Sequence, residues 1–470
     1  MPRIPENIIT LCVAVFLVCI SVASCGQEDN PVKRIVSESS VAQIDFSSWQ
    51  QETFRISQDC RRVAYVAESD GQQFVIVDGK SGKKYGAVSA PIFSPDSKRV
   101  AYVARGSGGK RFVVVDGNEG KKYDAVESPI FSPDGKRMAY AAKNGKNWFV
   151  VLDGNEGKGY GDIDSPVFSP DSKRVAYPAA TGENVVVAVN GNEGKGYENI
   201  ARGTIAFSPD SKLVAYVAEL GSKLSVVVNG KAGKKHDEID VSRPPVFSPD
   251  GGRVAYIAGT TNRWSVLVDG RADNEYNGIG ESGVIFSPDS KRVAYVAHVG
   301  SRRRVVIDGR AGKTYQATSK PIFSPDSSQL VYVAKTGNNW ALVVNGNEVM
   351  QYPGIDIPVF SSDGSRMAYG AVVDGKIAVI VDGKVAMKHD GRALNGVTLS
   401  PDGKRMTCAV RTENKWSIVV NGKDGKQYSD IIAPEKRGVI FDSPDSFHYL
   451  VQEGNNIFLV EETIEETAGL

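Results

Sequence analysis

The chain has 470 residues, of which 41% are hydrophobic and 24% are charged, so it is long enough to bury a large core. Its 56 Lys and Arg residues balance 55 Asp and Glu residues and are spread along the chain, which argues against a nucleic-acid partner. Of the five cysteines only Cys60 and Cys408 lie beyond residue 25, which excludes a disulfide framework or a cysteine-based metal cluster.

The N-terminal segment reads as an export signal. An apolar stretch from Ile8 to Ile20 is too short for a comfortable membrane span. It leads into Val22-Ala23-Ser24-Cys25, which resembles the bacterial lipobox, where small residues precede a cysteine that receives a diacylglycerol. The resemblance implies that residues 1–24 are a signal peptide and that lipid on Cys25 anchors an exported protein to a bacterial membrane, in the periplasm or at the cell surface. An ordinary secretory leader or an uncleaved anchor is the alternative.

A polar tether and a repeat array follow. Residues 25–40 are Ser-rich with little apolar material, which predicts a tether, and residues 41–470 form the array. One sequence motif recurs in the array and is clearest as Phe131-Ser132-Pro133-Asp134-Gly135-Lys136-Arg137. The aspartates of successive copies lie 37 to 43 residues apart. A period near 40 built from short apolar runs predicts propeller blades rather than a helical solenoid. The eleven aspartates are Asp59, Asp96, Asp134, Asp171, Asp210, Asp250, Asp289, Asp326, Asp363, Asp402 and Asp445.

Each repeat predicts a four-stranded, all-β blade. The Ser-Pro-Asp-Gly/Ser segment between the first two strands has turn chemistry, and an Asp-Gly or Asn-Gly dipeptide after the third strand is a strong hairpin signal. Such a meander cannot cover both of its faces alone, so neighbouring blades must stack. In the second repeat the expected strands are Pro91–Ser94, Arg99–Ala104, Arg111–Asp116 and Lys122–Val126.

The two ends of the array predict a closed ring. The eleventh repeat stops after Asn456–Val460 without a fourth strand, and Val41–Phe46 precedes the first repeat, so we expect this N-terminal strand to complete the last blade. Eleven blades exceed the usual four to eight, which leaves one wide ring or two fused rings of about five and six blades. A break between two rings is expected at the less regular junctions within residues 199–245.

The phrase Phe-Ser-Pro-Asp-Gly-Lys-Arg followed by a Val-Ala-Tyr-Val strand resembles the WD40-like repeat of TolB-type β-propellers. These occur in the bacterial periplasmic protein TolB and in the non-catalytic propellers of prolyl-oligopeptidase relatives. The match covers residues from about Glu52 to Leu459. It implies a periplasmic or surface-exposed binding platform, but the fold hosts many tasks and does not identify the partner.

The sequence offers no motif for catalysis or metal binding. A Gly-x-Ser-x-Gly elbow is missing, only four histidines are present, and one turn carboxylate per blade is too few oxygens for calcium. We therefore expect a non-enzymatic protein with no catalytic residue, no metal and no cofactor. The alternative is an enzyme whose polar residues converge at the channel mouth from several blades.

Two sets of residues are candidates for a binding surface. Aromatic residues near the start of the third strand either pack between blades or form a platform for envelope glycan or polymer. Basic pairs beside the Ser-Pro-Asp turns are expected to gather on one rim, and basic density is highest at Arg302, Arg303 and Arg304. The leading hypothesis is a scaffold for an envelope protein partner, with glycan binding as the alternative. The aromatic candidates are Trp148, Trp264, Trp340 and Trp416.

Overall fold

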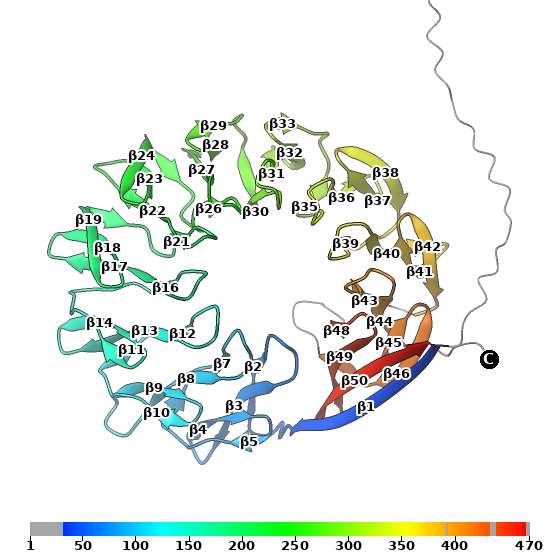
Figure 1. The fold of residues 1–470 in the computed structure, drawn as a ribbon, viewed down its shortest axis with the longest axis horizontal. Coiled ribbons are helices and arrows are strands. Elements are labelled where there is room, and N and C mark those ends of the chain that lie inside the picture. The colour runs from blue at the N-terminus through cyan, green and yellow to red at the C-terminus, as the bar shows by residue number, and fades with distance from the viewer. Residues whose placement is uncertain (1–31, 392, 433–438, 467–470) are drawn as a thin grey trace, which may run out of the picture.

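The computed structural model describes residues 32–391, 393–432 and 439–466 of the chain. Cys25 and the predicted signal peptide lie outside these residues. In the described ranges no helix is long and apolar enough to cross a membrane. The strands found there form eleven antiparallel sheets that follow one another around a single ring (Figure 1). The β-propeller prediction is confirmed, and of the two ring arrangements the single wide ring is correct.

The second strand of each blade is the most buried. In β3, for example, the first five residues are all buried, because both faces of the strand are covered by neighbouring blades. The strand is therefore a continuous apolar run instead of an alternating one. The second strands of blades 1 to 11 are β3 (Val63–Ser69), β8 (Val100–Arg105), β13 (Met138–Asn144), β17 (Val175–Thr181), β22 (Val214–Glu219), β27 (Val254–Thr260), β31 (Val293–Val299), β36 (Leu330–Thr336), β40 (Met367–Val373), β44 (Met406–Thr412) and β49 (Ser446–Glu453).

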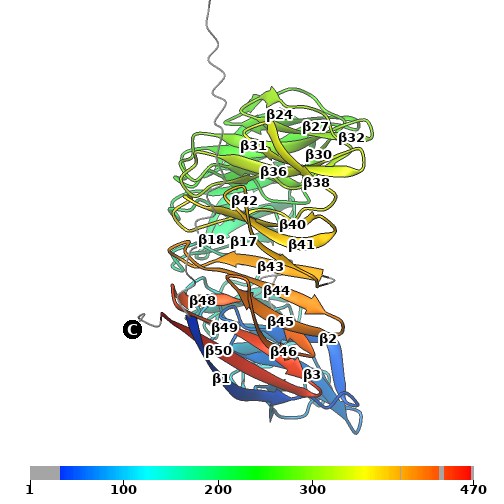
Figure 2. The same cartoon turned by 90° about the vertical axis from the view of Figure 1, so that its right-hand side faces the viewer.

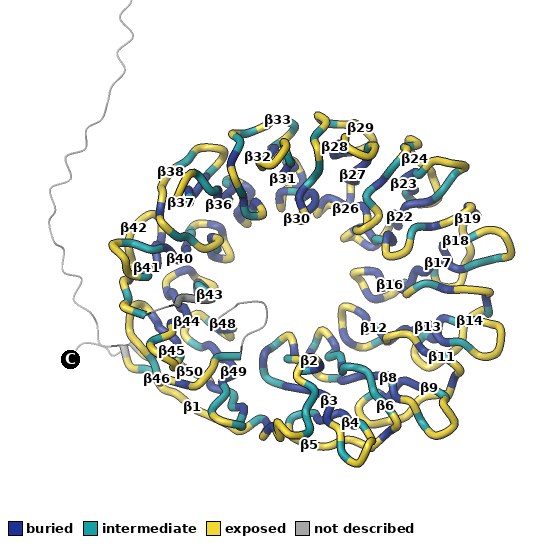
Figure 3. The backbone as a smooth tube through the Cα atoms, turned by 180° about the vertical axis from the view of Figure 1, so that it is seen from behind, coloured by how far each residue is buried: buried dark blue, intermediate teal, exposed yellow. Residues whose placement is uncertain are grey.

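The third strand pairs with the second throughout, and its apolar residues complete the stack between blades. Figure 3 shows burial concentrated in the strands and exposure at the turns. The third strands are β4 (Gln72–Val77), β9 (Arg111–Val115), β14 (Asn147–Leu152), β18 (Asn184–Val189), β23 (Leu224–Val228), β28 (Arg263–Val268), β32 (Arg302–Ile307), β37 (Asn339–Val344), β41 (Lys376–Val381), β45 (Lys415–Val420) and β50 (Asn456–Glu466).

The fourth strand differs from the prediction in the second repeat. The segment Lys122–Val126 is not one strand: Tyr123 forms a bridge back to Arg111, whereas Ala125 and Val126 pair with the next blade. The chain passes from blade 2 to blade 3 within Lys122–Val126, and its sequence does not show which residues pair with which blade. The fourth strands are β5 (Lys80–Ser81), β10 (Asn118–Glu119), β15 (Asn155–Glu156), β19 (Asn192–Tyr197), β24 (Lys231–His236), β29 (Arg271–Ala272), β33 (Arg310–Ala311), β38 (Asn347–Tyr352), β42 (Lys384–His389), β46 (Lys423–Tyr428) and, from the N-terminus, β1 (Val32–Gln43).

The first strand lines the inner side of the ring and in several blades is split into two short pieces (Figure 1). The link between the pieces leaves the sheet and rejoins it at the Phe-Ser of the repeat. The first strands are β2 (Trp49–Ile56), β6 (Ala87–Val88) with β7 (Ile92–Phe93), β11 (Ala125–Val126) with β12 (Ile130–Phe131), β16 (Val167–Phe168), β20 (Asn199–Ile200) with β21 (Ala206–Phe207), β25 (Glu238–Ile239) with β26 (Val246–Phe247), β30 (Gly278–Phe286), β34 (Ala317–Thr318) with β35 (Ile322–Phe323), β39 (Val359–Phe360), β43 (Ala393–Leu399), and β47 (Asp430–Ile432) with β48 (Ile440–Ser443).

The Asp-Gly and Asn-Gly dipeptides form the predicted tight hairpins. Asp78 and Gly79 have φ values of 50° and 74°, and Asn190 and Gly191 have φ values of 50° and 80°. Two consecutive positive φ values are the signature of a type I′ turn, whose twist matches that of the flanking strands. This geometry explains why each turn ends in glycine and begins with Asp or Asn, which tolerate the left-handed region.

The N-terminal strand closes the ring, as predicted, although it is longer than expected. It spans Val32–Gln43 and pairs antiparallel with β50 from the Val32–Glu466 pair to the Gln43–Asn456 pair. Residues 32–40, which the sequence analysis assigned to the polar tether, are therefore part of the last blade. Their polarity misled the prediction because β1 is an outermost strand, where most side chains face solvent.

Glu38 shows that β1 mimics the fourth strand of the other blades. Its carboxylate accepts a hydrogen bond of 2.5 Å from Tyr428 and lies 2.8 Å from the Lys426 ammonium. In blades 1 and 2 the same constellation joins Tyr85 and Lys83 to Glu119 of the next blade. The Lys426 hydrogen bond, followed by that of Tyr428, lowers the pKa of Glu38. The last blade is thus completed with a contact that the repeat also uses at several other blade junctions.

Antiparallel pairing gives the ring two distinct faces. The turn face carries the Ser-Pro-Asp turns and the Asp/Asn-Gly turns. The hairpin face carries the hairpins between second and third strands and the links between blades. β50 is a third strand and ends at Glu466 on the turn face, and β1 begins at Val32 beside it, so both described ends of the chain leave from the turn face (Figure 2).

Candidate functional site

The Ser-Pro-Asp turns of the turn face satisfy their own polar groups. The Ser132 hydroxyl donates to Asp134 at 2.6 Å and accepts from the Arg137 amide at 2.9 Å. The hydrogen bond from Ser132 lowers the pKa of Asp134, and the equivalent bond from Ser208 lowers the pKa of Asp210 to about 2. By this geometry the carboxylates cap their own turns. The same serine-to-aspartate bond joins Ser57 to Asp59, Ser94 to Asp96, Ser169 to Asp171, Ser208 to Asp210, Ser248 to Asp250, Ser287 to Asp289, Ser324 to Asp326, Ser361 to Asp363 and Ser400 to Asp402.

The turns also bind each other from blade to blade. The backbone amide of Asp134 donates to the Ser172 hydroxyl of the next blade at 3.0 Å, and Ser172 has a φ of 63°. In blade 3 the equivalent residue is Gly135, where a Cβ would lie 2.4 Å from Asp96 Oδ1. The side chain of Asp96 therefore leaves no room for a serine at this position.

An arginine staple ties most blades to the next. Arg62 Nε lies 2.8 Å from Asp78 Oδ2, and the same guanidinium donates to the Lys98 carbonyl of blade 2 at 2.8 Å. It also lies over the Phe93 ring, 5.4 Å from the centroid. These contacts tie the turns of one blade to those of the next. The equivalent ion pairs are Arg99–Asp116, Arg137–Asp153, Arg253–Asp269, Arg292–Asp308 and Arg366–Asp382.

The other Asp/Asn-Gly turns, in blades without the staple, carry asparagine in place of aspartate. In blades 5 and 8 the arginine position is occupied by Leu213 and Gln329. In blade 4 Arg174 lies over a phenylalanine ring of the next blade, and in blade 10 Arg405 pairs with Asp445. In blades 5, 8 and 10 the amide accompanies a missing or redirected arginine, whereas blade 4 keeps Arg174 over the next blade's ring with Asn190 in the turn. The neutral turns hold Asn190, Asn229, Asn345 and Asn421.

The predicted basic patch lies on the opposite face from the turns. Arg302, Arg303 and Arg304 begin β32 at the hairpin face, so they do not share a rim with the basic pairs beside the Ser-Pro-Asp turns. Alternation along the strand also separates them, because Arg302 and Arg304 point to one side of the blade and Arg303 to the other. Arg303 lies opposite His298, and burial followed by repulsion from Arg303 lowers the pKa of His298. Arg304 donates to Thr314 at 2.7 Å.

The four tryptophans also lie at the hairpin face, but on blades 3, 6, 8 and 10, which do not adjoin one another. Each is half-buried. Trp148, Trp264 and Trp416 pack against the apolar cluster shared with the following blade. The Lys143 ammonium lies 5.7 Å from the Trp148 ring centroid, and Lys335 stands in the same way over Trp340. These contacts favour the packing interpretation over a continuous aromatic platform.

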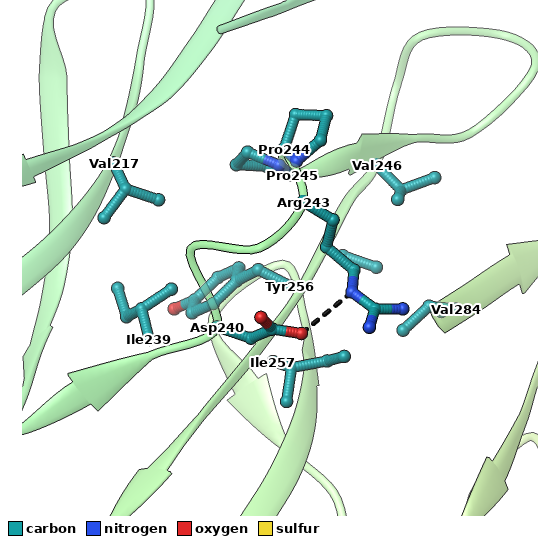
Figure 4. Close-up of a pocket in the computed structure, with 11 residues that line it drawn as sticks. Val217, Ile239, Asp240, Arg243, Pro244, Pro245, Val246, Tyr256, Ile257 and Val284 are labelled. Atoms are coloured by element: carbon teal, nitrogen blue, oxygen red, sulfur yellow. Dashed lines mark ion pairs between the residues drawn. The ribbon is translucent and has the colours of Figure 1, made fainter. Parts of the chain in front are cut away.

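The junction that was expected to separate two rings is instead tied across three blades. Figure 4 shows Arg243 reaching Asp240, 2.8 Å away, beside a cavity of about 10 Å³, which holds at most one water molecule. The Arg243 guanidinium donates to the Glu281 carbonyl of blade 7 at 2.7 Å. Val217 of blade 5 lines the same cavity. The long link of blade 6 is irregular because it carries this bridge, which the sequence alone did not indicate.

The hairpin face also holds a groove that sequence reasoning missed. It lies between blades 2 and 3, encloses about 250 Å³ and is lined in part by Arg105 and Arg111. The signal available in the sequence was the pair of arginines flanking the glycine-rich hairpin of blade 2, since blades 3, 8 and 10 place one cation and one tryptophan there.

No protein-family model and no curated protein matches the chain. Among solved structures it is similar to a eukaryotic initiation factor, with 14% identity and a TM-score of 0.39 over 70% of this chain and 96% of that one. It is similar to TolB from Acinetobacter baumannii, with 16% identity and a TM-score of 0.25 over 56% and 80% of the two chains. The β-propeller domain of the Trilobed protease from Pyrococcus furiosus has 15% identity and a TM-score of 0.29 over 59% and 98%. TolB and a protease propeller are thus among the similar structures, while the propeller assignment itself rests on the strand pairing.

Proposed function

We propose that the chain is a lipid-anchored, non-enzymatic scaffold of the bacterial envelope that binds a protein partner through its hairpin face. The observation that carries the proposal is the contrast between the two faces. The turn face repeats the same self-satisfied turn in ten blades and the arginine staple in six of them. The hairpins of the other face vary, from basic in blades 2 and 3 to acidic at Glu183, Glu413 and Glu453. Variable loops on a rigid frame are the usual means of recognition.

The position of the chain ends supports the same orientation. The chain enters the ring at Val32 on the turn face. Six residues, 26–31, separate Cys25 from Val32, and this segment reaches no further than about 25 Å when fully extended. Lipid on Cys25 therefore holds the turn face toward the membrane and leaves the hairpin face directed away from it. A ring with fixed loops also avoids the entropy cost of ordering each loop on binding.

The anchor is tested by Cys25→Ala. We expect the wild-type protein in the membrane fraction and the variant in the soluble envelope fraction, because the thiol that carries the lipid is gone. Mass spectrometry of the mature wild-type protein checks the modification directly. An unmodified Cys25, or a variant that stays with the membrane, contradicts the anchor.

The partner is tested by crosslinked affinity capture from envelope extracts with residues 26–470. A charge-reversal variant of the hairpin face, Arg302→Glu with Arg303→Glu, is compared with a matched variant of the turn face, Lys98→Glu with Lys136→Glu. A discrete protein retained by the wild type and the turn-face variant but lost by the hairpin-face variant supports the scaffold. Equal loss in both variants contradicts the choice of face. Recovery of glycan alone favours the alternative of a glycan binder, and recovery of neither contradicts the scaffold.

A further inference from the structure

The groove between blades 2 and 3 places two arginines side by side. Arg105 ends β8 and Arg111 begins β9, and the two are directly opposite each other in the antiparallel register. Residues that face each other in this way project to the same side of the sheet, here toward blade 3. Both line the groove, together with Val126 and Ser128 of blade 3. Two exposed guanidinium groups therefore share one side of one cavity.

This pairing differs from the one found at the same position in three other blades. At the same cross-strand position, blades 3, 8 and 10 pair a cation with a tryptophan: Lys143 with Trp148, Lys335 with Trp340, and Arg411 with Trp416. In these blades the aromatic ring lies against the cation. In blade 2 a second cation stands where the tryptophan would be. Like charges directly opposite each other destabilise a sheet, so the arrangement calls for a compensating anion.

No described carboxylate pairs with either arginine. Arg105 Nη2 lies 3.4 Å from the Gly86 carbonyl, and the Arg111 side chain makes no hydrogen bond or ion pair within the described ranges. Other cations beside the hairpins of this face do have acidic partners, as in Lys110–Asp124, Lys223–Asp237, Arg263–Glu275, Lys376–Asp390 and Lys415–Glu453. Glu127 precedes Ser128 on the link, but it does not line the groove. Within the described residues neither guanidinium group is thus neutralised by a carboxylate, and both are exposed to an incoming anion.

We propose that this groove binds an oxyanion group, a phosphate, sulfate or carboxylate, between Arg105 and Arg111. Guanidinium groups present paired N–H donors that match the geometry of such groups. The Ser128 hydroxyl makes no side-chain hydrogen bond to the described residues and faces the same groove, where it supplies a further donor. The site lies on the same face as the proposed partner surface, but its test does not depend on the scaffold function, because small anions are titrated without a partner protein.

The experiment is isothermal titration calorimetry of the mature protein with phosphate, sulfate and succinate in turn, at constant ionic strength set with chloride. We expect one site for at least one of these anions. Arg111→Gln should weaken binding by about tenfold or more, since one of the two guanidinium groups is lost. The three anions distinguish a tetrahedral from a carboxylate ligand. The matched control is Arg263→Gln, which removes one arginine from the same face of blade 6 and should leave the affinity unchanged.

A second variant tests the groove without relying on affinity. Arg111→Trp recreates the cation and tryptophan pair of blades 3, 8 and 10 and fills the cavity. Without added anion it should melt at a higher temperature than the wild type, and sulfate or phosphate should no longer raise its melting temperature. Circular dichroism confirms folding of each variant. The proposal is overturned if no anion binds, if Arg111→Gln binds as well as the wild type, or if anions stabilise the wild type and Arg111→Trp equally.

Discussion

Arg34 and Glu462 join the first strand of the ring to the last, with Arg34 Nη2 2.7 Å from Glu462 Oε2. Only 13% of the Arg34 side chain and 1% of the Glu462 side chain are exposed. Glu462 also accepts a hydrogen bond from Tyr449, and Arg34 donates to the Ile418 carbonyl of blade 10 at 3.2 Å. A strand from the N-terminus thus supplies the counter-ion for a carboxylate buried near the C-terminus.

Removing this counter-ion should open the ring. Arg34→Ala leaves Glu462 buried without its cation, and breaking a buried pair in this way costs about 3 to 5 kcal/mol. We expect a large drop in the urea midpoint and faster hydrogen exchange in β1. The matched control is Lys33→Ala, whose partner Glu465 is exposed, with 63% and 52% of the two side chains accessible. That change should cost less than about 1 kcal/mol, and equal effects of the two substitutions would refute the closure argument.

Blade 8 tests whether a charged turn residue needs the staple arginine as its partner. Asn345 accepts from the Leu330 amide at 2.9 Å, and Gln329 stands where other blades carry arginine. Asn345→Asp keeps the acceptor but adds a charge without a partner, so it should lower stability by about 0.5 to 1 kcal/mol. Adding Gln329→Arg should restore the lost stability, because the new arginine can pair with the introduced aspartate. A double variant no more stable than the single one, measured by urea unfolding, would show that the correlation carries no coupling.

Acid should reduce the folding stability that the turn aspartate Asp210 contributes. Hydrogen bonding by Ser208 holds the pKa of Asp210 at about 2, below its unfolded value of about 4. The folded state therefore binds fewer protons, and its stabilisation is complete above about pH 4 and is lost as the pH falls toward 2. Asp210→Asn does not titrate, so the stability difference between wild type and variant should shrink over that interval. Urea midpoints measured from neutral pH downward check this, and a constant difference would count against it.

The sequence predicted the parts of the fold that depend on local chemistry. The Ser-Pro-Asp and Asp-Gly signals mark turns because serine, proline and glycine impose those backbone angles wherever they occur. Ring closure was also predictable, since the last repeat lacks a strand. The length of β1 was not, because an outermost strand buries little and residues 32–40 look like a tether by composition.

The arrangement of residues on the two faces required the structure. Arg302 to Arg304 lie far from the basic turns because they stand at the opposite end of the strands, and strand ends are not distinguished by composition. The pairing of Arg105 with Arg111 was equally hidden. Each residue is ordinary alone, and only the register of β8 against β9 makes them neighbours. Blade-to-blade comparison at matched register positions recovers such departures.

Trp148 tests whether the tryptophans pack or bind. Its ring covers the apolar cluster shared by blades 3 and 4 and lies under the Lys143 ammonium. Because it is half-buried, Trp148→Ala should lower stability by about 2 kcal/mol, through lost apolar contact and a residual cavity. Trp148→Phe, which keeps an aromatic ring there, should recover most of the loss. Thermal unfolding of both variants, alongside binding to an array of envelope glycans, gives the answer: a Trp148→Ala variant as stable as the wild type but deficient in glycan binding would make this position a recognition surface and not an inter-blade contact.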